Sequence, residues 1–129
     1  MPFQSITSEQ APKPIGPYSA AVVVDGKFVY TAGQISIDPA TNQFIDGDIR
    51  TQTHQTLRSI DALLKSAGSS MKSVFKTTVF IKDMNEFGEM NKVYAEYFSL
   101  PAPARSTIEV ARLPKDAKVE IEVIALLEQ

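Results

Sequence analysis

The side chains of this 129-residue chain that are best suited to binding anions or moving protons lie near its C-terminal end. Arg105, Thr107 and Glu109 alternate with small or apolar residues, and Glu120 and Glu122 do the same further along. A period of two predicts two short strands, each with these polar groups on one face. A guanidinium offers a planar, two-pronged donor set for a carboxylate, a hydroxyl adds a third contact, and a carboxylate nearby can manage the protons of water.

The spacing of these two runs predicts a pair of strands joined by a turn. If residues 111–117 form the turn and the pairing is symmetric about it, Thr107 lies opposite Glu120 and Arg105 lies opposite Glu122. A shift of one residue would break this pairing. The pattern fits either an anion-binding acid–base site or a cross-strand ion pair on the surface, and spacing alone does not decide between them.

Length and composition predict one globular domain over residues 1–129. Hydrophobic residues make up 43% of the chain and charged residues 22%, and no apolar run approaches the roughly 18 residues that span a bilayer. The N-terminus lacks the pattern of a secretory signal or a transit peptide. We therefore expect a soluble cytoplasmic protein without a membrane partner, although a processed protein of the mitochondrial matrix would look the same.

Several kinds of chemistry are excluded by residue counts. The chain has no cysteine, which rules out disulfides, thiolate nucleophiles and zinc–sulfur sites. Its single histidine, His54, rules out a two-histidine metal site, and we interpret it as a solvated or half-buried helix residue without catalytic duty. The net charge of −2 and the scattered lysines disfavour nucleic-acid binding.

Three strands are predicted before the C-terminal pair. Residues 20–24 and 28–37 are rich in β-branched residues and flank Asp25-Gly26, which is a strong hairpin signal. Residues 74–82 predict a mostly buried strand. Gly33 falls inside the second strand, where glycine marks a bulge or a close approach of the backbone to another group.

Two helices are predicted between the strands. The first runs from a cap at Asp48 to a left-handed stop at Gly68, and the second from a cap at Asn85 to the prolines that begin at Pro101. Asn91 lies on or near the apolar stripe of the second helix, where a buried amide needs hydrogen-bond partners. It fits a structural hydrogen bond or a role beside a site.

The resulting order is strand, strand, helix, strand, helix, strand, strand, which predicts an α+β fold with two helices on one sheet. Two helices cover only one face, yet the strands carry apolar residues on both faces. Examples are Ala21 and Val23 against Val22 and Val24, and Val79 against Phe80. A second copy of the chain would cover the other face, so a homo-oligomer is expected.

Six segments, in order along essentially the whole chain, resemble the reactive intermediate deaminase family, also called RidA, YjgF-like or L-PSP proteins. The block that begins at Pro103 is the most specific of them. The segments are Ile15–Tyr18, Thr31–Ile35, Lys76–Asp83, Pro103–Ser106, Glu109–Asp116 and Ile121–Ala125.

The resemblance implies a chorismate-mutase-like α+β fold, a mixed sheet with two helices on one face, assembled as a homotrimer with a central barrel-like core and clefts between subunits. It also implies 2-iminobutanoate/2-iminopropanoate deaminase activity, which hydrolyses enamine and imine intermediates such as 2-aminoacrylate to 2-oxo acids and ammonia. Neither a metal nor an organic cofactor is implied. The expected partners are these small 2-imino acids, released by pyridoxal-phosphate enzymes, and their 2-oxo acid products.

Carried onto this chain residue by residue, the resemblance implies a catalytic group of Arg105, Glu120 and Tyr18. Arg105 would hold the substrate carboxylate and Glu120 would position or activate water. The backbone of Gly33 would approach the ligand, while Asn91 and Tyr18 would line the cleft, Tyr18 from a neighbouring subunit.

Two further substrate-binding positions depart from the common family pattern. Thr107 stands where many members have cysteine, and it keeps a hydroxyl that can donate to a carboxylate. Ala32 stands where many members have serine, and it offers no side-chain hydrogen bond, which would alter substrate preference.

Two other functions stay open. One is a non-enzymatic regulatory trimer that binds small 2-oxo or 2-amino acids, against which the presence of Arg105 favours the enzyme. The other is a ribonuclease or translation inhibitor, which the acidic balance and the single His54 make less favoured.

Overall fold

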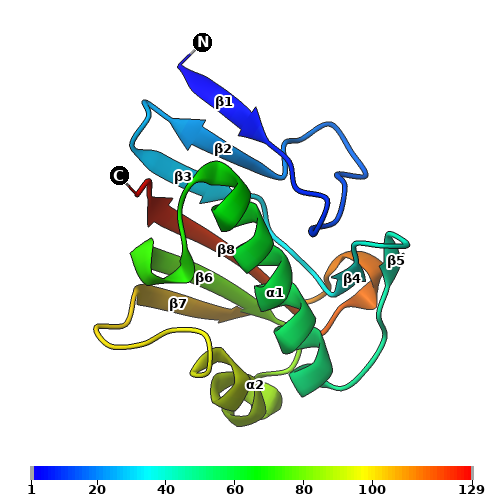
Figure 1. Cartoon of the computed structure of the whole chain (residues 1–129). Coiled ribbons are helices and arrows are strands. Elements are labelled where there is room, and N and C mark those ends of the chain that lie inside the picture. The colour runs from blue at the N-terminus through cyan, green and yellow to red at the C-terminus, as the bar shows by residue number, and fades with distance from the viewer. Residues whose placement is uncertain (1, 129) are drawn as a thin grey trace.

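The computed structural model describes residues 2–128, and a mixed six-stranded sheet lies at its centre (Figure 1). The strand order is β1-β2-β3-β8-β6-β7, with β6 and β7 parallel and all other neighbours antiparallel. The strands span β1 Phe3–Ile6, β2 Ala21–Val24, β3 Phe28–Thr31, β6 Val74–Ile81, β7 Ala104–Glu109 and β8 Val119–Leu126. A separate two-stranded sheet pairs β4 Ile37–Asp38 with β5 Gln43–Phe44.

Helices α1 (Ile49–Ala67) and α2 (Phe87–Tyr94) pack together on one face of the sheet (Figure 1). Short 3-10 turns lie at Met71–Ser73, Met84–Glu86 and Pro114–Asp116. This is the predicted α+β arrangement of a mixed sheet with two helices on one face. No helix within residues 2–128 has the length and apolar character that a membrane crossing requires.

Helix α1 begins and ends where its capping residues predict. Asp48 accepts a hydrogen bond from the Thr51 N–H at 2.8 Å, and Gly68 ends the helix with a left-handed φ of 91°. The hydrogen bond from the Thr51 N–H lowers the pKa of the Asp48 carboxyl. The face of α1 toward the sheet buries Leu57, Ile60, Leu63 and Leu64 completely.

The two faces of the sheet differ in what covers them. In β8, Val119, Ile121 and Val123 are buried on the helix side, while the residues between them point to the opposite face. We call this opposite side the open face. Large apolar side chains remain exposed on it: Tyr30 (44%), Phe75 (42%), Ile108 (44%) and Leu126 (48%).

The predicted pairing of the last two strands is wrong, because β6 lies between β7 and β8. Arg105 is the register partner of Thr77, and Thr107 that of Val79, so neither faces Glu122 or Glu120. β7 follows β6 through helix α2, and such a helical crossover allows the parallel pairing that is observed. Residues 110–118 then cross the end of β6 to reach β8, which pairs with the other edge of β6.

Several boundaries also differ from prediction. The strand expected over residues 28–37 ends at Thr31. Beyond it, Gln34 forms an isolated bridge to Ile121, and Ile37 begins the separate strand β4. Gly33 therefore lies outside a continuous strand. The expected cap at Asn85 is wrong as well, because Asp83 caps the 3-10 turn by accepting from the Asn85 N–H at 2.9 Å.

Candidate functional site

Arg105 projects from the helix side of β7 into a cradle built by helix α2. Its Nη1 donates to Asn91 Oδ1 at 2.7 Å, and its Cζ lies 4.7 Å from the centre of the Tyr94 ring and 5.3 Å from that of Phe87. These three α2 residues are spaced four and three apart, so they share one side of the helix. The cradle holds the guanidinium by stacking and one hydrogen bond, and its other N–H donors have no hydrogen-bond partner within residues 2–128.

Thr107 lies two residues after Arg105 on the same face of β7. Its Oγ1 is buried, and within residues 2–128 it has no hydrogen-bond partner. A buried polar atom without a partner is uncommon and costs stability, so it calls for a ligand or water. We call Arg105, Asn91 and Thr107 the arginine group.

Glu120 lies against Gly33. A Cβ built on Gly33 would come within 2.8 Å of the Glu120 Cδ, so a side chain at position 33 would force the carboxylate to move. Burial raises the pKa of the Glu120 carboxyl, and the negative charge of Glu122 raises it further. Glu120 can therefore carry a proton at a higher pH than an exposed glutamate does.

A cavity of about 170 Å³ opens beside Glu120 and Gly33. Tyr18 also borders it, with its ring half exposed and its hydroxyl accepting from the Ile15 N–H at 3.4 Å. We call Glu120, Gly33 and Tyr18 the glutamate group. The full lining is Pro12, Lys13, Pro14, Ile15, Tyr18, Ala20, Gly33, Gln34, Ile35, Ile37, Pro114 and Glu120.

Residue types alone did not single out Pro114 or the proline-rich arm as walls of this cavity. This arm is the segment of residues 12–17, which contains three prolines, and nothing in its composition indicates a pocket. Ala32 precedes Gly33 and donates its N–H to the Ala20 carbonyl at 2.8 Å, but it is not among the residues that line the cavity.

The arginine and glutamate groups lie on opposite faces of the sheet. Across β7, β6 and β8, Ile108, Phe80 and Glu120 form one row on the open face. Arg105 belongs to a row on the helix face, with Thr77 beside it. A single chain therefore presents two separated half-sites, whereas the resemblance implies clefts between subunits.

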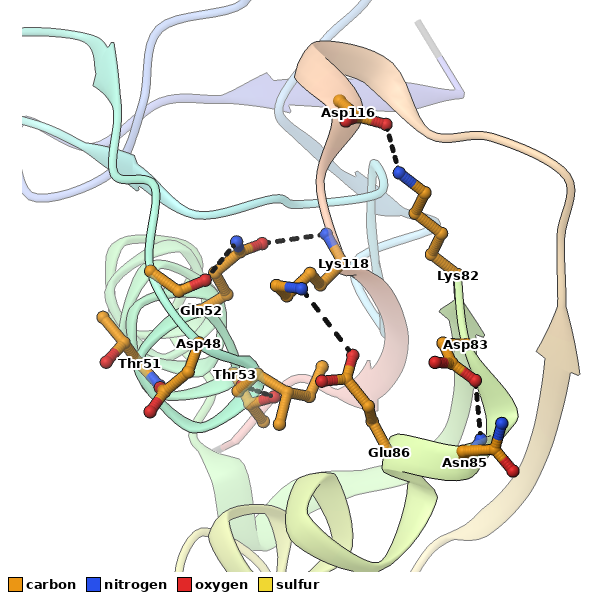
Figure 2. A network of polar contacts seen from close by, with 12 residues as sticks. Asp48, Thr51, Gln52, Thr53, Lys82, Asp83, Asn85, Glu86, Asp116 and Lys118 are labelled. Atoms are coloured by element: carbon orange, nitrogen blue, oxygen red, sulfur yellow. Dashed lines mark hydrogen bonds and ion pairs between the residues drawn. The ribbon is translucent and has the colours of Figure 1, made fainter.

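Residues 110–118 connect the two strands that carry these groups, and a polar network holds this segment (Figure 2). The Lys118 N–H donates to Gln52 Oε1 of α1 at 2.9 Å, and Lys82 Nζ donates to Asp116 Oδ1 at 2.5 Å. The lysine lowers the pKa of the Asp116 carboxyl. The network fixes the segment that places Pro114 beside the cavity.

His54 is half-buried in α1, as expected, with Nδ1 3.0 Å from the Tyr97 hydroxyl. Within residues 2–128, no group of three or more histidine, cysteine, aspartate or glutamate residues could hold a metal ion.

Comparison with known proteins gives a match to the family described as endoribonuclease L-PSP over residues 8–127. The chain belongs to the L-PSP family. This confirms the resemblance that its motifs carry. It is 55% identical over 123 residues to a RutC family protein of Pyrococcus horikoshii, covering 95% of this chain and 97% of that protein.

Two further members of the L-PSP family are informative. The 2-iminobutanoate/2-iminopropanoate deaminase of Dermatophagoides farinae is 44% identical over 127 residues, covering 98% of each chain. The crystal structure of Escherichia coli TdcF with bound serine matches with a TM-score of 0.89 at 41% identity, covering 97% of this chain and 99% of that one. The fold and the family are thus shared with proteins of known structure.

Proposed function

We propose that this protein hydrolyses small 2-imino acids and their enamine tautomers to 2-oxo acids and ammonia. The observation that carries the proposal is the Arg105 cradle, which presents a fixed guanidinium on the same face of β7 as the Thr107 hydroxyl. That hydroxyl has no hydrogen-bond partner within residues 2–128. This donor set suits a carboxylate. Two relatives support a small ligand of amino-acid type. The Dermatophagoides farinae protein is named as an imino-acid deaminase, and the TdcF structure contains bound serine.

The reaction adds water to the carbon of a C=N bond. A proton leaves the water as its oxygen bonds to carbon, the nitrogen gains protons, and the C–N bond then breaks to release ammonia and leave a C=O group. Arg105 would hold the carboxylate, and Glu120 would take the proton from water and return it to nitrogen. A raised pKa suits this role because the carboxyl can hold the proton between the two steps.

We further propose that the site is completed by a second copy of the chain, within the homotrimer that the family resemblance implies. Arg105 and Glu120 lie on opposite faces of one sheet, so an arginine group from one subunit must meet a glutamate group from another. The exposed apolar residues of the open face support burial against another copy. Tyr18 would then enter the shared cleft from the subunit that supplies Glu120.

The roles of the remaining site residues follow from their positions. Asn91 orients Arg105, Thr107 adds a hydroxyl contact to the carboxylate, and Gly33 keeps Glu120 in place. Ala32 would act only through the backbone beside Gly33. The description of the family as endoribonuclease does not change the expectation from net charge that RNA is not the substrate.

The test is release of the 2-oxo acid when a dehydratase generates 2-aminoacrylate from serine in the presence of this protein. Wild-type protein should accelerate pyruvate formation over spontaneous decay, and Arg105→Ala should abolish the acceleration without changing the oligomer. Arg58→Ala, which removes an arginine of α1, serves as the matched control. No acceleration by the wild-type protein would refute the enzyme proposal.

A further inference from the structure

Tyr94 lies directly beneath the guanidinium of Arg105 and is fixed at both ends. Its ring centre is 4.7 Å from Arg105 Cζ, and only 7% of the residue is exposed. Its hydroxyl lies 2.8 Å from Thr77 Oγ1, and its ring packs 4.6 Å from that of Phe98. A buried ring held in this way has little freedom to tilt.

Thr77 links this ring to the strand that carries the arginine. It is fully buried, and it is the register partner of Arg105 in the parallel β6–β7 pair. Backbone pairing, the Thr77–Tyr94 hydrogen bond and the stacking on Arg105 therefore form a closed set of contacts. Burial raises the pKa of the Tyr94 phenol, so it stays protonated around neutral pH and can donate to Thr77.

We propose that Tyr94, held by Thr77, is a positioning residue that sets the plane of the Arg105 guanidinium and so the angle at which a substrate carboxylate binds. The inference rests on the proposed function of Arg105. Two-pronged binding needs the guanidinium and the carboxylate to lie in one plane. Asn91 fixes only one nitrogen, so the aromatic rings beside the guanidinium define that plane. Of the two, Tyr94 is nearer to Arg105 Cζ, at 4.7 Å against 5.3 Å for Phe87, and its hydroxyl is also held by Thr77.

The experiment compares four variants with one matched control. Tyr94→Leu removes the ring, Tyr94→Phe removes only its hydroxyl, Thr77→Val removes the partner hydroxyl, and Thr77→Ser keeps it. The control is Thr56→Val, which changes a buried threonine of α1 whose hydroxyl has no hydrogen-bond partner within the described chain. Calorimetry gives the Kd of 2-oxobutanoate and of its uncharged amide, and the dehydratase assay gives KM and kcat.

Tyr94→Leu should raise the Kd of 2-oxobutanoate about 5- to 30-fold, the loss expected for a cation–π contact. Tyr94→Phe and Thr77→Val should raise it roughly three- to tenfold, as for one hydrogen bond, while Thr77→Ser and Thr56→Val leave it unchanged. The preference for the carboxylate over the amide should fall in parallel, with KM rising and kcat nearly constant. A general packing defect would not change that preference.

The other possible results separate the positioning role of Tyr94 from the proposed function of Arg105. If Tyr94→Phe and Thr77→Val fold normally and keep the wild-type Kd and carboxylate preference, the positioning role is refuted, even if Tyr94→Leu fails to fold. If Arg105→Ala itself keeps the wild-type Kd for 2-oxobutanoate, the proposed function of Arg105 fails instead. Loss of binding in Arg105→Ala with normal binding in the Tyr94 and Thr77 variants would refute only the inference.

Discussion

At the scale of single residues, Gly33 and Glu120 constrain each other. An alanine at position 33 would place a methyl group 2.8 Å from the Glu120 Cδ and displace the carboxylate. Because misplacing a catalytic group by about 1 Å can cost on the order of 100-fold in rate, Gly33→Ala should lower kcat by roughly that factor. Gly88→Ala is the control, since nothing lies within 4 Å of the added methyl group. Equal kcat values for the two variants would contradict this role of Gly33.

The raised pKa of Glu120 predicts a pH dependence. Glu120 must be ionised to accept a proton from water, so kcat/KM should fall toward acid with a midpoint above the ordinary glutamate value of 4.5. Glu122→Gln removes the neighbouring negative charge and should move that midpoint to lower pH. A pH–rate profile of both proteins tests this, and an unshifted acid limb would show that another group controls it.

The raised pKa of Glu120 also affects stability: the ionised form that activity needs is the less stable one. The folded pKa of Glu120 lies above its unfolded value, so the folded state binds this proton more tightly and is stabilised by it at low pH. That contribution is lost as pH rises through the folded pKa. Ionised Glu120 therefore lowers the free energy of unfolding at neutral pH, a cost consistent with a residue kept for function.

At the scale of elements, the end of α1 depends on a backbone conformation that suits glycine. Gly68 has a φ of 91°, and its N–H bonds to the carbonyls of the last helical turn. Gly68→Ala should lower the free energy of unfolding by about 1–2 kcal/mol, the cost of a left-handed non-glycine residue. Gly88→Ala, within helix α2, should raise it by up to roughly 1 kcal/mol. Urea denaturation of both variants measures the difference, and a neutral Gly68→Ala would contradict it.

Elements with local signals could be predicted from the sequence, and long-range pairings could not. Asp48, Gly68 and Asp25-Gly26 fix their helix ends and hairpin through neighbouring residues, so their patterns were sufficient. Strand β1 was missed because Phe3–Ile6 has little alternation and forms the edge of the sheet, where it pairs with β2. The order β8-β6-β7 was missed because nothing local distinguishes a hairpin from a crossing of the sheet.

For the candidate site too, the sequence indicated individual residues but not their arrangement across strands. Alternation brought forward Arg105 and Glu120, the helical stripe brought forward Asn91, and motif resemblance implied their roles. The structure adds the Arg105–Asn91 bond and the Gly33–Glu120 contact. The separation of the two groups could not be read from alternation within single strands. It follows from the insertion of β6 between β7 and β8, which places Arg105 and Glu120 on opposite faces.

At the scale of the whole molecule, the opposite placement of Arg105 and Glu120 predicts complementation between inactive subunits. Arg105→Ala and Glu120→Gln should each lose roughly 100- to 10,000-fold in activity, the range for loss of acid–base function or substrate positioning. When the two are unfolded, mixed equally and refolded together, random assembly should restore about a quarter of the sites, because each restored site takes one intact residue from each neighbour.

The matched control for this experiment replaces Glu120→Gln with the double variant Arg105→Ala/Glu120→Gln. Mixed with Arg105→Ala, the double variant provides no intact arginine, so no activity should return at any ratio. Size-exclusion chromatography with light scattering checks that both mixtures assemble equally. Recovery only in the first mixture requires Arg105 and Glu120 to act from different copies of the chain, since a site built within one chain would remain broken in every subunit. Absence of recovery in fully mixed oligomers would rule out the shared cleft while leaving the Arg105 cradle unchanged.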